Sequence, residues 1–134
     1  MPAIKQMPIA IKFWLPVLLC MGFIFYTSSI PGSEMPCLFP LQDIVFHLFI
    51  YSILCFFFSR ALKNTYLNIT RAKIIVFTII FGIIYAASDE LHQAFVPYRS
   101  VSGFDVFIDT IGSLVGSLIY PVRKGFLTGL GKFF

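Results

Sequence analysis

Charged residues are scarce in this sequence, and hydrophobic residues are abundant. Only 12% of the 134 residues are charged, whereas 58% are hydrophobic. A water-soluble domain carries about 25% charged residues, so an ordinary soluble enzyme or binding domain is excluded. The mean hydropathy of +0.89 instead indicates an integral membrane protein. The length suits one domain, and we expect a single all-α membrane domain over residues 1–134.

Paired cysteines and closely spaced metal ligands are also missing. Cys20, Cys37 and Cys55 form no CxxC spacing, and two of them lie inside apolar runs. A disulfide framework or a zinc knuckle needs paired or closely spaced cysteines, so neither is expected. There is no HExxH-like spacing either. We therefore assign no metal ligands, and no feature of the sequence identifies a cofactor.

Four long apolar runs separate short polar segments. A helix needs about 20 residues to cross the hydrocarbon core of a bilayer. The third run has fewer strictly apolar residues than this, so its helix must continue through the polar residues that follow and stop near Pro97. The runs predict a membrane-embedded four-helix bundle with helices at residues 9–26, 43–60, 73–96 and 103–120. The first run lacks an Ala-x-Ala-like cleavage site, so we expect it to remain as a helix.

The basic residues are distributed unevenly between the connections. Nine of the ten lie in the N-terminal segment, the second connection and the C-terminal segment, and only Arg99 lies in the others. Basic connections stay in the cytoplasm, so we expect both termini to be cytoplasmic. All six acidic residues then lie toward the extracytoplasmic side. The net charge of +4 reflects this orientation, and we expect no nucleic-acid partner.

Polar side chains gather where the last three helices meet the extracytoplasmic side. Residues three or four apart lie on one face of a helix. Ionisable groups in a membrane are energetically costly unless they are paired or have a function. We therefore expect these polar faces to meet, with Arg99 and the two histidines as counter-charges to the carboxylates. The polar faces are Asp43, His47 and Tyr51; Asp89 and His92 beside Glu90 and Gln93; and Asp105 and Asp109.

Two further patterns concern the last helix. Ser102-Gly103-Phe104-Asp105 resembles a capping box with an acid in its last position, which predicts a helix start near Ser102. Gly112 and Gly116 form a small-xxx-small pair. Such pairs allow helix backbones to approach closely in lipid, so this face should pack against a neighbouring helix.

Three interpretations of the polar cluster remain open. Histidine and carboxylates can act as general acid and base while arginine holds an anionic group. The same side chains could hold a metal, or they could form ion pairs that only fasten helix ends together. Under the first interpretation, the candidates for catalysis or orientation are Asp43, His47, Glu90 and Gln93. The candidates for ligand binding are Arg99, Asp89, His92, Asp105, Asp109 and Tyr51.

Three pieces of the sequence carry a resemblance to a known family: Phe25–Pro31, Asp43–His47 with Tyr51, and Asp89–Arg99 followed by Asp105 and Gly112. In these pieces the chain resembles the VanZ-like family of small bacterial membrane proteins, named for a member linked to teicoplanin resistance. The resemblance implies a multi-pass protein of the bacterial inner membrane. It also implies that the functional positions are Asp43, His47, Glu90, Gln93, Arg99 and Asp105.

The chain departs from that family pattern at two positions. Ile44 stands where the pattern has a lysine, and Asp109 stands where it has an asparagine. Both changes make the charge of the polar cluster more negative, which argues against a site for anions alone.

We therefore expect an extracytoplasmic polar site that binds or acts on an envelope lipid or a glycopeptide-related ligand, with a contribution to teicoplanin-type resistance. The lipid bilayer is the other expected partner. One alternative is a membrane-embedded enzyme that uses acid–base or metal-assisted chemistry on a lipid-linked substrate. The other is a structural partner subunit, held together by ion pairs between its helices.

Overall fold

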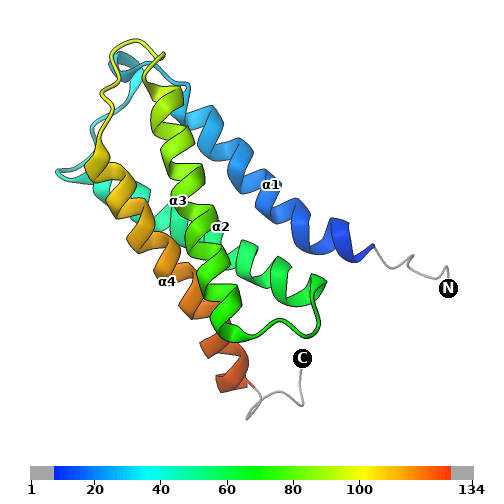
Figure 1. Ribbon diagram of the computed structural model, residues 1–134. Helices are drawn as coiled ribbons and strands as arrows, with labels where there is room; N and C mark the ends of the chain where they lie inside the picture. Colours follow the sequence, from blue (N-terminus) through cyan, green and yellow to red (C-terminus); the bar gives the residue numbers. More distant parts are fainter. Residues whose placement is uncertain (1–7, 128–134) are drawn as a thin grey trace, which may run out of the picture.

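Four α-helices account for nearly all of the chain. The computed structural model describes residues 8–127, with side chains over residues 8–120. The helices are α1 (Ile9–Ser28), α2 (Gln42–Thr65), α3 (Arg71–Gln93) and α4 (Gly103–Leu127), and a 3-10 turn, η1 (Gly32–Glu34), lies between the first two (Figure 1). No strand occurs within residues 8–127. The predicted all-α fold is confirmed.

Each helix is long and apolar enough to cross a membrane. The most apolar stretches have mean hydropathies of 2.0 in α1, 1.8 in α2, 1.9 in α3 and 1.3 in α4. Spans of 18 to 24 residues satisfy the length of about 20 residues that a bilayer requires. The chain is therefore a multi-pass membrane protein.

α2 continues beyond the predicted helix end at residue 60, to Thr65. Contacts with α1 accompany the additional turn. The indole Nε1 of Trp14 donates to Thr65 Oγ1 over 2.9 Å, and the guanidinium of Arg60 lies 4.6 Å from the ring centre of Phe13. The longer helix also includes Lys63, which the predicted bounds assign to the connection.

α3 ends at Gln93, before the predicted end at residue 96. Its last turn tightens, because the N–H groups of Phe95 and Val96 donate to the carbonyls of His92 and Gln93. Such bonds to the third preceding residue are common where a helix ends. The chain therefore leaves the helix axis ahead of Pro97 and turns across the end of the bundle.

The helices run antiparallel to their neighbours in sequence, so the two connections α1–α2 and α3–α4 lie together at one end (Figure 1). α2 is central and packs against the other three helices, most extensively against α4. α1 lies at the edge and does not contact α4 over the described residues. Leu18, Leu19 and Phe23 of α1 are exposed and suit contact with lipid.

Two glycines allow α2 and α4 to approach closely. A Cβ on Gly112 would lie 2.7 Å from the carbonyl oxygen of Leu48, and a Cβ on Gly116 would overlap that of Ser52. The predicted small-xxx-small packing of this helix face is confirmed. It sets the distance between the two helices that carry His47 and Asp109.

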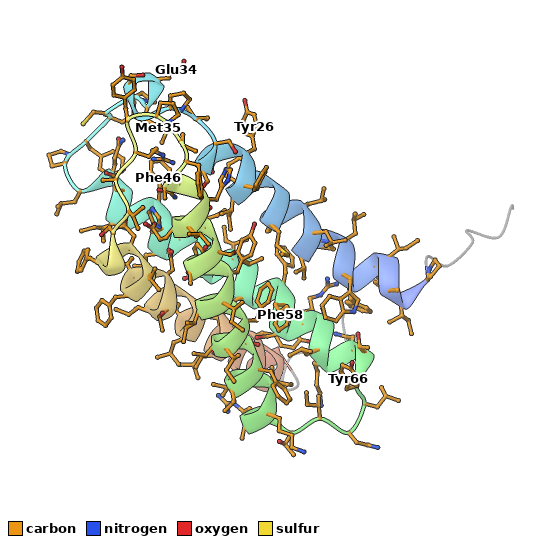
Figure 2. All side chains as sticks on the ribbon, turned by 45° about the horizontal axis from the view of Figure 1, so that its top comes forward. Tyr26, Glu34, Met35, Phe46, Phe58 and Tyr66 are labelled. Atoms are coloured by element: carbon orange, nitrogen blue, oxygen red, sulfur yellow. The ribbon has the colours of Figure 1, made fainter. Side chains whose placement is uncertain are left out.

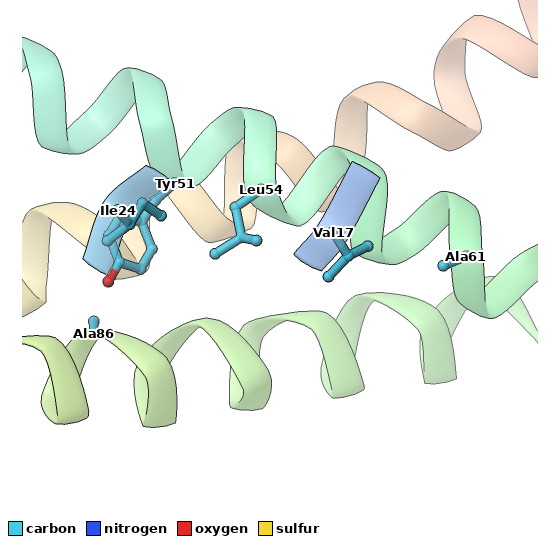
Figure 3. Packing of buried hydrophobic residues seen from close by; sticks show 6 residues of the cluster. All are labelled: Val17, Ile24, Tyr51, Leu54, Ala61 and Ala86. Atoms are coloured by element: carbon cyan, nitrogen blue, oxygen red, sulfur yellow. The ribbon is translucent and has the colours of Figure 1, made fainter. Parts of the chain in front are cut away.

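A small apolar core holds α1, α2 and α3 together (Figure 3). Its buried members are Val17, Ile24, Tyr51, Leu54, Ala61 and Ala86. Deeper between α2 and α3, the hydroxyls of Ser59 and Thr78 form a 2.9 Å hydrogen bond. This bond satisfies two buried polar groups that would otherwise be costly in an apolar environment.

Candidate functional site

A polar cavity of about 380 Å³ lies at the end of the bundle where the two connections meet. Figure 2 shows this end, marked by Met35 and Phe46, and the opposite end, marked by Tyr66. The cavity volume falls in the range of about 300–1,000 Å³ that is typical of ligand sites. Its polar lining includes Gln42, Asp43, His47, Gln93, Arg99 and Asp105. Five of the ten site residues predicted from the sequence thus share one cavity.

A second hollow, of about 670 Å³, lies at the opposite end beside the α2–α3 connection. Its lining is mainly apolar, and Lys73 is its charged member. Because it brings no acid or histidine together with that lysine, the polar cavity at the other end is the stronger candidate site.

The α1–α2 connection forms one wall of the polar cavity, and Gln42 holds it in place. The side chain of Gln42 accepts from the N–H of Leu38 and donates to the carbonyl of Pro36, both over 2.6 Å. The oxygen and the nitrogen of its amide thereby both hold the connection against the start of α2. Nothing in the sequence pattern separates this glutamine from its neighbours, and sequence reasoning missed it.

The α3–α4 connection docks against the same wall at Gly32. The N–H of Gly32 donates to the carbonyl of Pro97 over 3.1 Å. A Cβ at this position would overlap the carbonyl oxygen of Tyr98, so only glycine fits. Leu41 and Tyr98 adopt left-handed backbone conformations with φ of 62° and 58°. Such strain in non-glycine residues is often found at ligand sites.

His47 and Asp109 form a pair that joins α2 to α4. The imidazole Nδ1 lies 2.9 Å from Asp109 Oδ1. The histidine side chain is 20% exposed and lines the cavity, whereas the aspartate side chain is 1% exposed and lies behind it. A buried carboxylate on one ring nitrogen orients the imidazole. Asp109 Oδ2 is buried and makes no hydrogen bond to any described residue.

Glu90 connects the end of α3 to the start of α4. Its Oε2 accepts from the backbone N–H of Ser102 over 2.8 Å. The N–H of Asp105 in turn donates to Ser102 Oγ over 3.4 Å. One of the two bonds of the predicted capping box is therefore present, from the Asp105 N–H to the Ser102 side chain. In a complete box the Asp105 carboxylate would accept from the Ser102 N–H. Here Glu90 takes that place. The other oxygen, Oε1, is buried and without a partner in the described part of the chain.

Asp89 and Gln93 lie one turn apart on α3. Gln93 Nε2 donates to Asp89 Oδ2 over 3.2 Å, and both side chains are buried. Gln93 also lines the cavity. Since only one N–H of the amide is bound to Asp89, the amide oxygen and the second N–H are left for a ligand.

Of the five predicted site residues that do not line the cavity, His92 and Tyr51 have their contacts elsewhere in the bundle. The ring of His92 stacks on Phe25 with 4.5 Å between centroids, and its Nε2 lies 2.9 Å from Ser29 Oγ. His92 therefore fastens α3 to the end of α1. Tyr51 lies in the apolar core, and its buried hydroxyl has no partner among the residues whose side chains are described.

Arg99 lines the cavity but does not pair with a carboxylate. Its Nη2 donates to the carbonyl of Thr27 over 3.3 Å, at the C-terminal end of α1, where the helix dipole attracts a cation. Nε is buried and unpartnered within the described chain. The one ion pair over residues 8–120 is His47–Asp109. The expectation that Arg99 offsets the carboxylates by direct pairing is not met, because Arg99 reaches toward α1 instead.

Over the described residues, no three His, Cys, Asp or Glu side chains converge as metal ligands would. The arrangement supports binding of a polar group by hydrogen bonds and charge, and proton transfer at His47.

The family model described as VanZ/LLP1 matches residues 13–124. The chain belongs to the VanZ/LLP1 family. The match covers most of α1 and the whole of α2 and α3, together with all of the polar lining of the cavity. Neither the curated proteins nor the solved structures contain a significant match to this VanZ/LLP1 chain.

Proposed function

We propose that this VanZ/LLP1 protein binds the polar headgroup of an envelope lipid in the cavity between the α1–α2 and α3–α4 connections. The observation that carries the proposal is the position of Arg99. Its guanidinium lines a cavity at the end of a membrane-spanning bundle, with a buried Nε that makes no hydrogen bond over residues 8–120. Arginine binds phosphate through several N–H donors.

The rim of the cavity favours an amphiphile over a water-soluble ligand. Phe39, Leu41 and Tyr98 line the cavity and are exposed. Tyrosine is enriched at membrane–water interfaces, and the apolar side chains of Phe39 and Leu41 suit contact with lipid. A headgroup can occupy the polar cavity while its acyl chains remain against the apolar helix faces.

The cavity opens on the extracytoplasmic side of the bacterial inner membrane, and both termini are cytoplasmic. This orientation rests on the basic residues, nine of which belong to the N-terminal, second-connection and C-terminal segments of the sequence. By holding an envelope lipid there, the protein contributes to teicoplanin-type resistance. Labelling of the exposed Cys37 from outside the cell tests the orientation.

Replacing Arg99 by alanine is expected to weaken lipid binding about tenfold or more. A hydrogen bond to a charged group contributes about 1.5–3 kcal/mol, and about 1.4 kcal/mol corresponds to a tenfold change in affinity. Native mass spectrometry of the detergent-purified protein with added phosphatidylethanolamine measures the retained lipid.

Arg71→Ala is the matched control, because Arg71 is exposed at the start of α3, away from the cavity. It should retain lipid as the wild type does. Equal retention by the Arg99→Ala and Arg71→Ala proteins would refute the proposed site.

A second candidate function, acid–base catalysis on a lipid-linked substrate, is favoured by the pair His47–Asp109. A histidine oriented by a buried carboxylate is the usual arrangement of a general base, and His47 faces the cavity. The same lipid incubations separate the two functions. Lipid recovered unchanged supports binding, whereas a product that disappears in a His47→Gln protein supports catalysis.

A further inference from the structure

The charges that line the cavity are not balanced. Asp43 and Asp105 both line it, and their carboxylates accept no hydrogen bond from any side chain over residues 8–120. Arg99 is the one arginine or lysine in the lining. It donates to the Thr27 carbonyl rather than to either acid. Two carboxylates and one guanidinium thus face the same space.

A further polar group reaches the cavity from a buried position. Gln93 is 4% exposed and lines the cavity. Its nitrogen donates to Asp89, whereas its amide oxygen accepts no hydrogen bond from the described residues. The amide oxygen can accept a hydrogen bond from a donor on the ligand, while the second N–H of the amide remains available as a donor.

Resting on the headgroup-binding function above, we propose that the cavity selects a zwitterionic headgroup that carries an ammonium group beside its phosphate. The ammonium has three N–H donors and a positive charge. It donates to Asp43 and Asp105 and to the amide oxygen of Gln93, while Arg99 holds the phosphate. Hydrogen bonds between ionised partners are the stronger kind.

A purely anionic headgroup fits this cavity poorly. Its phosphate would satisfy Arg99 but would leave Asp43 and Asp105 without a counter-charge, and like charges at short range repel. Asp109 does not offset these two acids, because it is itself an acid and pairs with His47. The lining therefore discriminates between lipids by the amine rather than by the phosphate.

The test compares lipids with identical dioleoyl chains by native mass spectrometry of the full-length protein. The three lipids are phosphatidylethanolamine, phosphatidylglycerol and N-acetyl-phosphatidylethanolamine, which keeps the phosphate but loses the ammonium. The wild type is expected to retain phosphatidylethanolamine about tenfold more strongly than the other two. Asp43→Asn and Asp105→Asn should each reduce this preference, while retaining phosphatidylglycerol.

Glu34→Gln is the matched control, because Glu34 lies in η1 at the same end of the molecule but is not part of the cavity lining. Its lipid preference should equal that of the wild type. Retained phosphatidylglycerol shows that each variant is folded and still binds through Arg99. Equal retention of all three lipids by the wild type would overturn the ammonium selection and leave headgroup binding intact. No retention of any lipid would overturn both.

Discussion

A Gly116→Ala protein is expected to lose about 1–3 kcal/mol of stability, as over-packed cores do. The added Cβ would overlap the carbonyl oxygen of Ser52 and lie 2.8 Å from the backbone nitrogen of Phe56. Both contacts are with α2 backbone, which cannot rotate aside as a flexible side chain does. α2 and α4 must therefore separate, and the His47–Asp109 pair that joins them should lengthen.

Thermal unfolding in detergent measures the effect of the Gly116 substitution, with Gly22→Ala as the control. Gly22 lies inside α1, and a Cβ there meets no atom within 4 Å. Alanine is about 1 kcal/mol better than glycine in a helix interior, so this control should be as stable as the wild type or slightly more stable. Equal unfolding temperatures for the two variants would contradict the close α2–α4 packing.

The second large effect is expected at Glu90. A Glu90→Ala protein leaves the partly buried N–H of Ser102 without its acceptor, and a fully buried unsatisfied donor costs about 1–3 kcal/mol. Glu90→Gln keeps an oxygen in place and removes only the charge, so its loss should be smaller. The loss should concentrate at the first turn of α4, where amide hydrogen exchange reports it directly.

The two Glu90 variants also separate the structural role from a role in the site. Faster exchange at the start of α4 in the alanine variant alone is the result that the Ser102 contact predicts. Wild-type exchange in both variants would mean that Glu90 does not hold this helix end. A glutamine variant that is stable but retains less lipid would show that the charge of Glu90 acts on the ligand.

Much of the fold follows from patterns within single helices. Runs of apolar residues locate the four spans, and the spacing of Gly112 and Gly116 identifies the face that packs closely. Ser102 marks the start of α4 through its side chain, as the capping pattern predicts. These features depend on a residue and its near neighbours, so the sequence contains the information that they need.

The partners across helices are harder to derive. Periodicity places His92 and Asp89 on one face of α3 but does not say that His92 meets Phe25 of α1. Arg99 was expected beside carboxylates, yet it binds the end of α1 at Thr27. Which neighbour each face meets depends on the rotation and depth of the whole helices. That arrangement is set by packing over many residues rather than by local spacing.

The cavity wall formed by the α1–α2 connection could not be predicted for a related reason. Its shape depends on the hydrogen bonds of Gln42 and on the close approach of Gly32 to Tyr98. Prolines and a glycine indicate a connection there but not its path. The sequence therefore locates the polar residues more accurately than it defines the space between them.

The most direct test of a headgroup site on the extracytoplasmic side uses Cys37. This thiol is exposed and lines the cavity. A membrane-impermeant maleimide is added to intact cells that produce the wild type, Arg99→Ala, or a Cys37→Ser control. We predict labelling of Cys37 from outside, slowed several-fold in the wild type relative to Arg99→Ala because bound lipid covers the thiol. Labelling that requires permeabilised cells, or equal rates in the two proteins, would contradict the site.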